Sequence, residues 1–308
     1  MVRHEYGNGD MYEGDMVDFQ RVGMGRMDWV NGSTYSGNFV NDVANGHGKQ
    51  VFANGASYEG EWKDGVGNGY GRYSYLDGSF YEGQWVHGSK HGFGQLCNSD
   101  GSCYEGNFIN GLQSGSGRFV TNIGEVYEGE WLDGKQHGYI TYISIDGYRY
   151  EGNYSHGKKN GKGKMYCPDG ELYIGEFKDD KKEGNGRKIF SNGTIYEGNF
   201  TNNKYDMIGT KISPNGDIYY GSFKNGLKHG KGKQKFKHQD ASGWVIYDGD
   251  WDEGFMHGQG TLYKVSDSKS NGNNKGGSSK SKGNSNSNSG EWELKILYKG
   301  KWKDGNKA

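Results

Sequence analysis

The chain has 308 residues, of which only 31% are hydrophobic even with tyrosine included, while glycine contributes 58 residues and proline 2. So few aliphatic side chains exclude a thick globular core, and regularly spaced aromatic residues argue against general disorder. The net charge is −1, yet residues 1–154 hold 10 Lys/Arg against 20 Asp/Glu and residues 155–308 hold 27 against 18. Such an asymmetry is typical of a basic surface for a polyanion, or of drift among solvated loop residues.

Tyrosine recurs every 23 residues over most of the chain. Two further copies of the pattern, at Tyr247 and Tyr298, follow at longer intervals. A fixed period of this length indicates a repeat array, in which each unit buries its apolar side chains against its neighbours. The regularly spaced positions are Tyr12, Tyr35, Tyr58, Tyr81, Tyr104, Tyr127, Tyr150, Tyr173, Tyr196 and Tyr219.

The unit that begins at Tyr58 shows why the repeats are predicted to be strands. Side chains alternate along a strand, so Tyr58, Gly60 and Trp62 point to one face and the charged residues between them to the other. A neighbouring ring can lie over the bare backbone of Gly60. A second strand at 72–75 and turn residues at 76–78 complete a hairpin. We therefore expect an all-β fold, an elongated, twisted, single-layer antiparallel meander of repeated β-hairpins.

The array is predicted to occupy residues 1–265, with an incomplete unit before Tyr12 and a short insertion near 238–242. Residues 266–290 form a Ser/Asn/Gly/Lys tract, which is typical of a disordered insertion. Residues 291–308 resume the pattern as a final truncated repeat. Because the cost of closing a loop grows slowly with its length, we interpret the tract as a loop at a hairpin tip.

Three cysteines are too few for the disulfide framework of a secreted protein. Cys97 and Cys103 flank one turn and could approach each other, but we expect a reduced pair. The first ten residues lack an apolar signal core, and no run of about 18 apolar residues is present. We expect a cytoplasmic protein that is not secreted and has no transmembrane segment, with any membrane or cytoskeletal contact peripheral.

The stretch Tyr-Glu-Gly-Glu-Trp-Lys-Asp-Gly at residues 58–65, followed by His/Asn-Gly-x-Gly and a closing Asp/Asn-Gly, resembles the MORN repeat (membrane occupation and recognition nexus). The resemblance covers essentially the whole chain outside 266–290. It implies a scaffold for proteins or membranes. MORN relatives bind extended or helical partner segments along a groove lined by the repeat aromatics, and some dimerise or associate with phosphoinositides. Since the repeats fill this chain, we expect no appended kinase or methyltransferase activity.

Four residues depart from the repeat. Met16 takes the aromatic position of the first unit, and Phe19 stands where glycine is usual. Ile140 replaces the second loop glycine of the sixth unit, and Met207 replaces the other loop glycine of the ninth. We expect these changes to alter local loops but not the fold.

Three recurring motifs are interpreted as structural. The Gly-x-Gly sequences lack the following helix that a phosphate-binding loop needs. His91, His137, His229 and His257 share a position filled by Asn elsewhere, and neighbours would lie about 10 Å apart, too far to share one zinc ion. The repeat glutamates recur in nearly every hairpin, whereas a catalytic pair should be singular. We expect no catalytic residues, no metal site and no cofactor.

The repeat aromatics are the candidate partner-binding residues. Stacking between repeats, worth about 0.5–1.5 kcal/mol per pair, explains part of their presence. A single layer has no second layer to cover this face, so one edge of each ring should remain available to a partner. We predict a non-enzymatic scaffold or adaptor at membrane or cytoskeletal structures, with Trp62, Trp85 and Trp131 as anchors. The full set is Tyr58, Trp62, Tyr81, Trp85, Tyr104, Phe108, Tyr127 and Trp131.

Lysines of the basic half suggest an alternative function. Each lysine near an anionic leaflet is worth about 1 kcal/mol, so these residues could bind anionic lipids or phosphoinositides and regulate a lipid kinase in trans. A solubilising surface explains them equally well. No nucleic-acid module is recognised, and the opposite charges of the two halves also permit a homodimer. The lysines are Lys158, Lys159, Lys181, Lys182, Lys224, Lys228, Lys231, Lys233 and Lys235.

Overall fold

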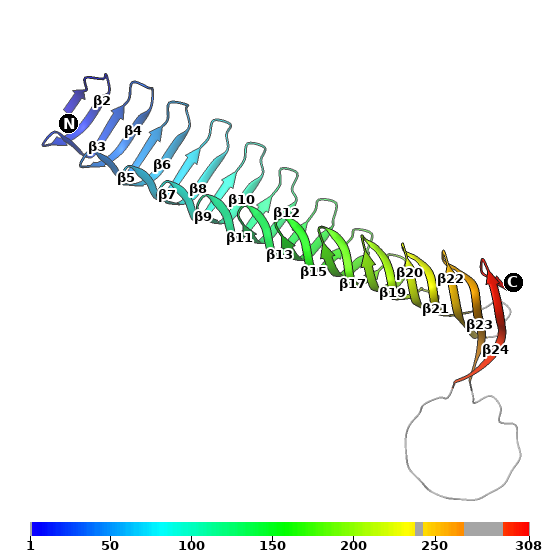
Figure 1. The fold of residues 1–308 in the computed structure, drawn as a ribbon. Coiled ribbons are helices and arrows are strands. Elements are labelled where there is room, and N and C mark those ends of the chain that lie inside the picture. Colours follow the sequence, from blue (N-terminus) through cyan, green and yellow to red (C-terminus); the bar gives the residue numbers. More distant parts are fainter. Residues whose placement is uncertain (1, 238–242, 268–291, 308) are drawn as a thin grey trace, which may run out of the picture. The chain divides into compact units, whose positions relative to one another are not determined.

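The computed structural model describes residues 2–237, 243–267 and 292–307, which contain strands and turns and no helix. The chain divides into two compact units, Met1–Pro168 and Asp169–Ala308; Figure 1 shows the hairpins of each unit in chain order. The predicted all-β meander is confirmed within each unit. Most of the predicted disordered tract and the insertion at 238–242 lie outside the described residues, although strand β23 includes Ser266 and Asp267.

In the N-terminal unit, each strand pairs antiparallel with the next one along the chain. The strands are β1 (Val2–Glu5), β2 (Met11–Val17), β3 (Gln20–Asp28), β4 (Thr34–Val40), β5 (Val43–Val51), β6 (Ser57–Lys63), β7 (Val66–Ser74), β8 (Phe80–Val86), β9 (Ser89–Cys97), β10 (Cys103–Ile109), β11 (Leu112–Val120), β12 (Val126–Leu132), β13 (Lys135–Ile143), β14 (Arg149–Ser155) and β15 (Lys158–Tyr166).

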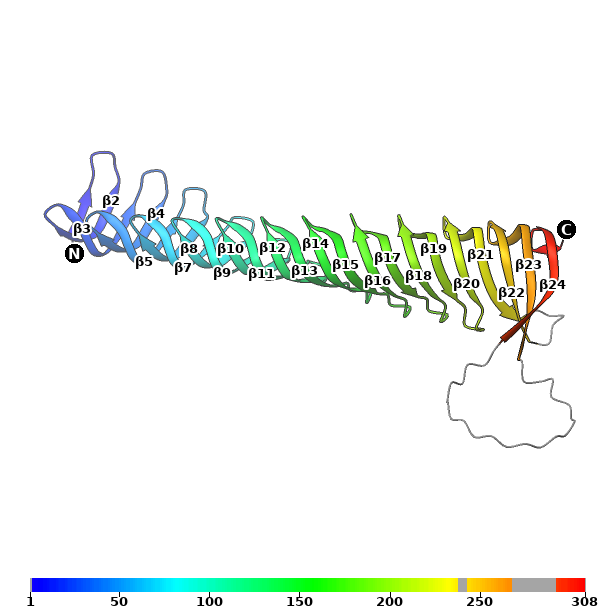
Figure 2. The same ribbon diagram turned by 60° about the horizontal axis from the view of Figure 1, so that its bottom comes forward.

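The C-terminal unit follows the same rule of pairing (Figure 2). Its strands are β16 (Leu172–Lys178), β17 (Lys181–Ile189), β18 (Ile195–Thr201), β19 (Lys204–Ile212), β20 (Ile218–Lys224), β21 (Leu227–Lys237), β22 (Trp244–Asp252), β23 (Phe255–Asp267), β24 (Trp292–Lys303) and β25 (Asn306–Lys307).

The tyrosine that begins each repeat lies on a pair of glycines in adjacent strands. Gly60 of β6 pairs with Gly71 of β7, and a Cβ added at Gly71 would stand 2.4 Å from the Tyr58 hydroxyl oxygen. That hydroxyl donates a hydrogen bond of 2.9 Å to the carbonyl of Glu61. The Tyr58 side chain is buried. The ring of the same repeat, and not that of a neighbour as predicted, therefore lies on Gly71, while Gly60 is required because a Cβ there would stand 2.3 Å from the Cα of Gly71.

The rings of successive repeats contact one another edge to face. The Tyr58 ring centre lies 5.0 Å from that of Trp62 in its own repeat and 5.2 Å from that of Trp85 in the next. The Trp85 indole N–H also donates to the carbonyl of Gly71 at 2.9 Å. Since the Tyr58 ring touches aromatic residues of two repeats, the ladder couples neighbouring repeats within a unit, the nearest-neighbour stabilisation expected of a repeat protein.

The turn after the first strand of a repeat is tied to the preceding repeat. Asp64 and Gly65 both have positive φ, 50° and 78°, which suits the two-residue hairpin turn that follows β6. The Gly65 N–H donates to the carbonyl of Ala44 at 3.0 Å. Phe19 takes the second turn position of the first repeat with φ 64° and a ring that is 94% exposed.

Ile140 shows the effect of losing one of the paired glycines. Its side chain is fully buried opposite Gly129 and fills the space that the tyrosine ring takes in other repeats. Tyr127 is only partly buried and instead packs beside Tyr142, with ring centres 4.6 Å apart. The departure therefore changes the core and not a loop, contrary to expectation. Met207, by contrast, keeps the left-handed backbone of the glycine it replaces, with φ 55°.

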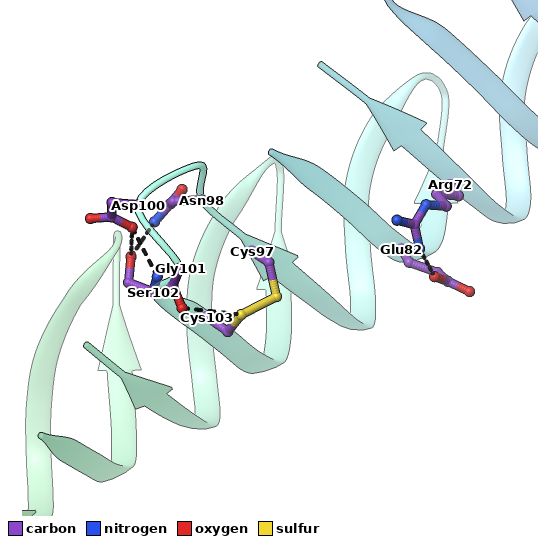
Figure 3. Close-up of a disulfide and its surroundings, with 8 residues drawn as sticks. All are labelled: Arg72, Glu82, Cys97, Asn98, Asp100, Gly101, Ser102 and Cys103. Atoms are coloured by element: carbon purple, nitrogen blue, oxygen red, sulfur yellow. Dashed lines mark hydrogen bonds and ion pairs between the residues drawn. A yellow bond between two sulfur atoms is a disulfide. The ribbon is translucent and has the colours of Figure 1, made fainter. Parts of the chain in front are cut away.

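Cys97 and Cys103 are joined by a disulfide, which corrects the expected reduced pair (Figure 3). The two residues face each other across β9 and β10 with their Cα atoms 4.1 Å apart. The sheet register itself therefore brings the two thiols together, at the two ends of the turn formed by residues 98–102.

We expect Gly94→Ala to destabilise the array by about 1–3 kcal/mol, because it overpacks the core. A Cβ at Gly94 would lie 2.4 Å from the Tyr81 hydroxyl oxygen and 2.6 Å from Cζ. Gly7→Ala is the matched control, since a Cβ there meets nothing within 4 Å. The measurement is the urea midpoint of each variant; equal midpoints would contradict the proposed role of the glycine pair.

Candidate functional site

The sheet of each unit has two faces. The tyrosine face carries the repeat tyrosines and the aromatic residue four positions later, and the glutamate face carries the side chains that point the other way. In β6, Tyr58, Gly60 and Trp62 are buried, whereas Glu59 between them is exposed. The alternation predicted for this repeat is confirmed.

Most of the predicted partner-binding residues belong to the core. Tyr127 is partly buried, but the other seven side chains are between 0% and 8% exposed. The ring edges expected to remain available are therefore mostly covered. Binding by these residues stays a prediction, and its location depends on where a ring is uncovered. The seven are Tyr58, Trp62, Tyr81, Trp85, Tyr104, Phe108 and Trp131.

A side chain from the second strand of the repeat covers the tyrosine ring. Lys90 lies opposite Trp85 in the pairing of β8 with β9, and its Nζ is 5.3 Å from the centre of the Tyr81 ring. Lys159 covers Tyr150 in the same way at 5.0 Å. The equivalent positions from the first to the seventh repeat hold Arg21, Ala44, Gly67, Lys90, Gln113, Gln136 and Lys159.

This cover is absent at Gly67, where a hollow of about 230 Å³ opens on the tyrosine face. Its walls include Tyr58, Trp62, Trp85 and Tyr73. A Cβ at Gly67 would lie 2.9 Å from Cζ of Tyr58, so the lack of a side chain leaves the hollow beside the ring, although Tyr58 itself is only 3% exposed. Three of the eight predicted residues are thus brought together in one hollow, and the other five lie outside it.

The glutamate face carries exposed aromatic residues that were not among the candidates predicted from the sequence. Tyr70, Phe93 and Tyr139 take the same place in three repeats and are 54%, 55% and 53% exposed. Each of them follows a loop glycine. The residue two positions later pairs with a repeat glutamate, as Arg72 pairs with Glu82. Because residues two apart on a strand point to the same face, the sequence alone would have placed these aromatic residues on the glutamate face.

The C-terminal unit has its own hollow on the glutamate face, of about 730 Å³. Ile208 and Tyr220 line it and are more than half exposed. Arg187 and Glu197 supply its charged wall.

The nine predicted lipid-binding lysines do not share one surface. Lys159, Lys182 and Lys228 lie over tyrosine rings. Lys231 and Lys233 form ion pairs on the opposite face, with Asp250 at 2.6 Å and Asp248 at 2.9 Å. The side chains of Lys158, Lys181 and Lys224 are exposed beside turns, and Lys235 lies 5.0 Å from the centre of the Trp244 ring.

Comparison with protein-family models places the MORN repeat along most of the chain. The chain belongs to the MORN-repeat family. In this MORN array, every match begins at a repeat tyrosine, which confirms the 23-residue unit. The matched segments are residues 12–34, 35–57, 58–80, 81–103, 104–126, 127–147, 150–171, 173–195, 196–218, 219–237 and 247–269.

Among solved structures, the MORN array is similar to a TCP10 domain of Danio rerio CPAP, with 11% identity over 71% of this chain and 96% of the other and a TM-score of 0.37. The SAS-4 (dCPAP) TCP domain of Drosophila melanogaster, solved with a proline-rich motif of Ana2 (dSTIL), shows 11% identity over 57% and 88% and a TM-score of 0.32. A streptogramin B lyase shows 14% identity over 85% and 88%, with a TM-score of 0.14. No curated protein matches.

Within the described part of the MORN array, no helical segment has the length and apolar character needed to span a bilayer.

The burial of Lys228 predicts that the stability of the protein depends on pH. Its Nζ lies 4.5 Å from the Trp251 ring centre and 5.1 Å from that of Tyr219. Burial, aided by nearby Lys211, lowers the pKa of Lys228 to about 8. An unfolded lysine keeps a pKa of about 10.4, so between these values the unfolded state binds more protons, and stability increases as pH rises.

We expect Lys228→Met to remove this dependence, because Met256 occupies the same place in the following repeat. From pH 7.5 to 9.5 the parent protein should gain about 1–2 kcal/mol relative to the variant. Urea midpoints measured across this range provide the check, and parallel pH profiles for the two proteins would refute the prediction.

Proposed function

We propose that the protein is a non-enzymatic scaffold that binds an extended or helical segment of a partner protein on the tyrosine face of its N-terminal unit. Its MORN repeats support a protein-binding role. The observation that supports this binding site is the hollow at Gly67, where Tyr58, Trp62 and Trp85 converge.

The hollow suits one apolar side chain of a partner. Its volume of about 230 Å³ lies below the roughly 300–1,000 Å³ of sites that enclose drug-sized ligands. The polar atoms of three of its rings already have partners, since the Tyr58 hydroxyl donates to the Glu61 carbonyl and the indole N–H groups of Trp62 and Trp85 donate to the carbonyls of Gly48 and Gly71 at 2.9 Å. Recognition here would therefore depend on shape and apolar contact, for which rigid tryptophan and tyrosine side chains are the usual anchors.

The neighbouring repeat limits the hollow along the array. Lys90 covers Tyr81 and also lies 5.6 Å from the ring centre of Tyr75, so the uncovered stretch ends at this lysine. A partner segment that continued past Lys90 would meet its ammonium group. The anchor residue would then be apolar, and an acidic residue would suit the position next to it.

The other predicted functions have less support. Binding of anionic lipids or phosphoinositides, control of a lipid kinase, homodimer formation and a place at membrane or cytoskeletal structures stay predictions. For the lipid alternative, the relevant observation is that five of the nine lysines lie over rings of the tyrosine face or form ion pairs on the glutamate face. These five are less available to an anionic surface.

We expect Gly67→Gln to close the hollow and abolish partner binding. Glutamine occupies the equivalent position twice, as Gln113 and Gln136, so the repeat accepts this residue; because a Cβ at Gly67 would lie 2.9 Å from the Tyr58 ring, the urea midpoint of the variant is measured beside its binding. Trp62→Ala would be a poorer test, because it removes a ring from the core ladder. Short random peptides selected on the parent protein should bind the variant at least about tenfold more weakly.

His47→Gln on the exposed glutamate face is the control, and it should bind the selected peptides as the parent does. Peptides that bind Gly67→Gln and the parent equally would show that the hollow is not the binding site.

A further inference from the structure

Phe93 stands between two hollows on the glutamate face of the N-terminal unit. One hollow, of about 280 Å³, is also lined by Tyr70, Glu82 and Glu105. The other, of about 490 Å³, is lined by Glu105, Arg118 and Glu128 in addition to Phe93. An exposed ring with carboxylates at its rim attracts cations, because the ring face and the carboxylates are both negative.

The same face already holds arginine side chains in this way. The guanidinium of Arg72 lies 3.8 Å from the centre of the Phe80 ring and 2.7 Å from a carboxylate oxygen of Glu82; Figure 3 shows its contact with Glu82. Arg149 repeats the arrangement, paired with Glu151 and lying 5.8 Å from the centre of the Tyr166 ring. A ring with a nearby carboxylate is thus a receptor for arginine in this protein.

At Phe93 the ring and the carboxylates are present without a cation. Among the described residues, no cation lies over the Phe93 ring, and neither Glu105 nor Glu128 forms an ion pair. Arg118 is opposite both glutamates in the sheet register but forms an ion pair with neither.

The surrounding charge favours a positive ligand. Between Glu59 and Thr141, the side chains that point to this face from the middle of the strands include six carboxylates and two guanidinium groups; Glu59 pairs with Lys49 just outside this stretch and Glu82 pairs with Arg72. The carboxylates are Glu59, Glu61, Glu82, Glu105, Glu128 and Glu130, and the guanidinium groups are Arg72 and Arg118.

We propose that this surface, formed by Phe93, Glu105 and Glu128, binds the arginine side chains of a basic protein segment that crosses the strands. Arginine suits it better than lysine because the planar guanidinium stacks on a ring while it bonds a carboxylate. This ligand chemistry differs from that of the hollow at Gly67, and the surface lies on the opposite face of the sheet.

The repeat geometry fixes the spacing of the arginines. Two strands per repeat, about 4.8 Å apart, separate equivalent positions by about 9.6 Å. An extended chain covers that distance in about three residues. The two hollows beside Phe93 belong to successive repeats, so the matching segment carries arginine at every third position.

The test uses the full chain and a fluorescent, acetylated and amidated peptide with arginine at every third position and serine between. Binding is followed by fluorescence anisotropy at low salt. Two further peptides serve as controls, one with citrulline in place of arginine and one with arginine at every second position. The arginine peptide with the longer spacing should bind most tightly, and added salt should weaken it.

The deciding variants are Phe93→Ser and Glu105→Gln. Serine is the residue found in the column of equivalent positions, 23 residues apart, at Ser116 of the next repeat. Each variant should weaken binding about fivefold. Met24→Ser, an exposed position of the same column in the first repeat, should leave it unchanged. Glu105→Gln keeps the shape of the side chain, so it tests the charge even if Phe93→Ser proves unstable.

The proposal would be overturned by the absence of saturable binding, by equal binding of the citrulline peptide, or by equal affinity of the parent protein and Glu105→Gln. Gly67→Gln should bind the arginine peptide normally. Loss of binding in that variant would place the peptide on the tyrosine face and would also overturn the proposal. The proposal for each site can therefore be disproved without affecting the other.

Discussion

The contact of a tyrosine ring with a pair of glycines is the constraint on which this fold depends. In the repeat of Tyr81, a Cβ on Gly94 would stand 2.4 Å from the hydroxyl and one on Gly83 would stand 2.4 Å from the Cα of Gly94. No larger residue fits without moving the ring, as Ile140 and the displaced Tyr127 demonstrate. Because the ring then meets aromatic neighbours on both sides, a thin sheet can bury its aromatic residues without a second layer.

Packing of the rings against one another and against the sheet removes the repeated aromatic residues from the surface. The polar groups of Tyr58 and Trp62 donate hydrogen bonds to backbone carbonyls, and their rings pack edge to face against each other. Recognition therefore depends on positions where the repeats differ. One such position either places a side chain over the ring, as Lys90 does, or leaves a hollow beside it, as Gly67 does. Another decides whether the glutamate face presents an aromatic ring, as at Phe93, or a small residue, as at Ser116.

The sequence was sufficient to predict the all-β fold, the period and the two faces, because all three follow from the alternation of side chains around Gly60 and its equivalents. The burial of seven of the eight aromatic residues could not be predicted in the same way. It depends on edge-to-face contacts between rings of neighbouring repeats, to which some repeats add a long side chain from the next strand, as Lys90 does over Tyr81. The disulfide of Cys97 and Cys103 follows from a strand register that the sequence does not specify uniquely.

The repeat architecture also explains why such variation is tolerated. Stability in an array is largely a sum of contacts within repeats and between neighbours, and those contacts are made by the tyrosines, glycines and tryptophans of the ladder. Gly67 and Phe93 contribute little to it, since one lacks a side chain and the other is more than half exposed. Substitutions there can change what each face binds without disturbing the fold, so one scaffold can present an apolar hollow on one face and an acidic, aromatic surface on the other.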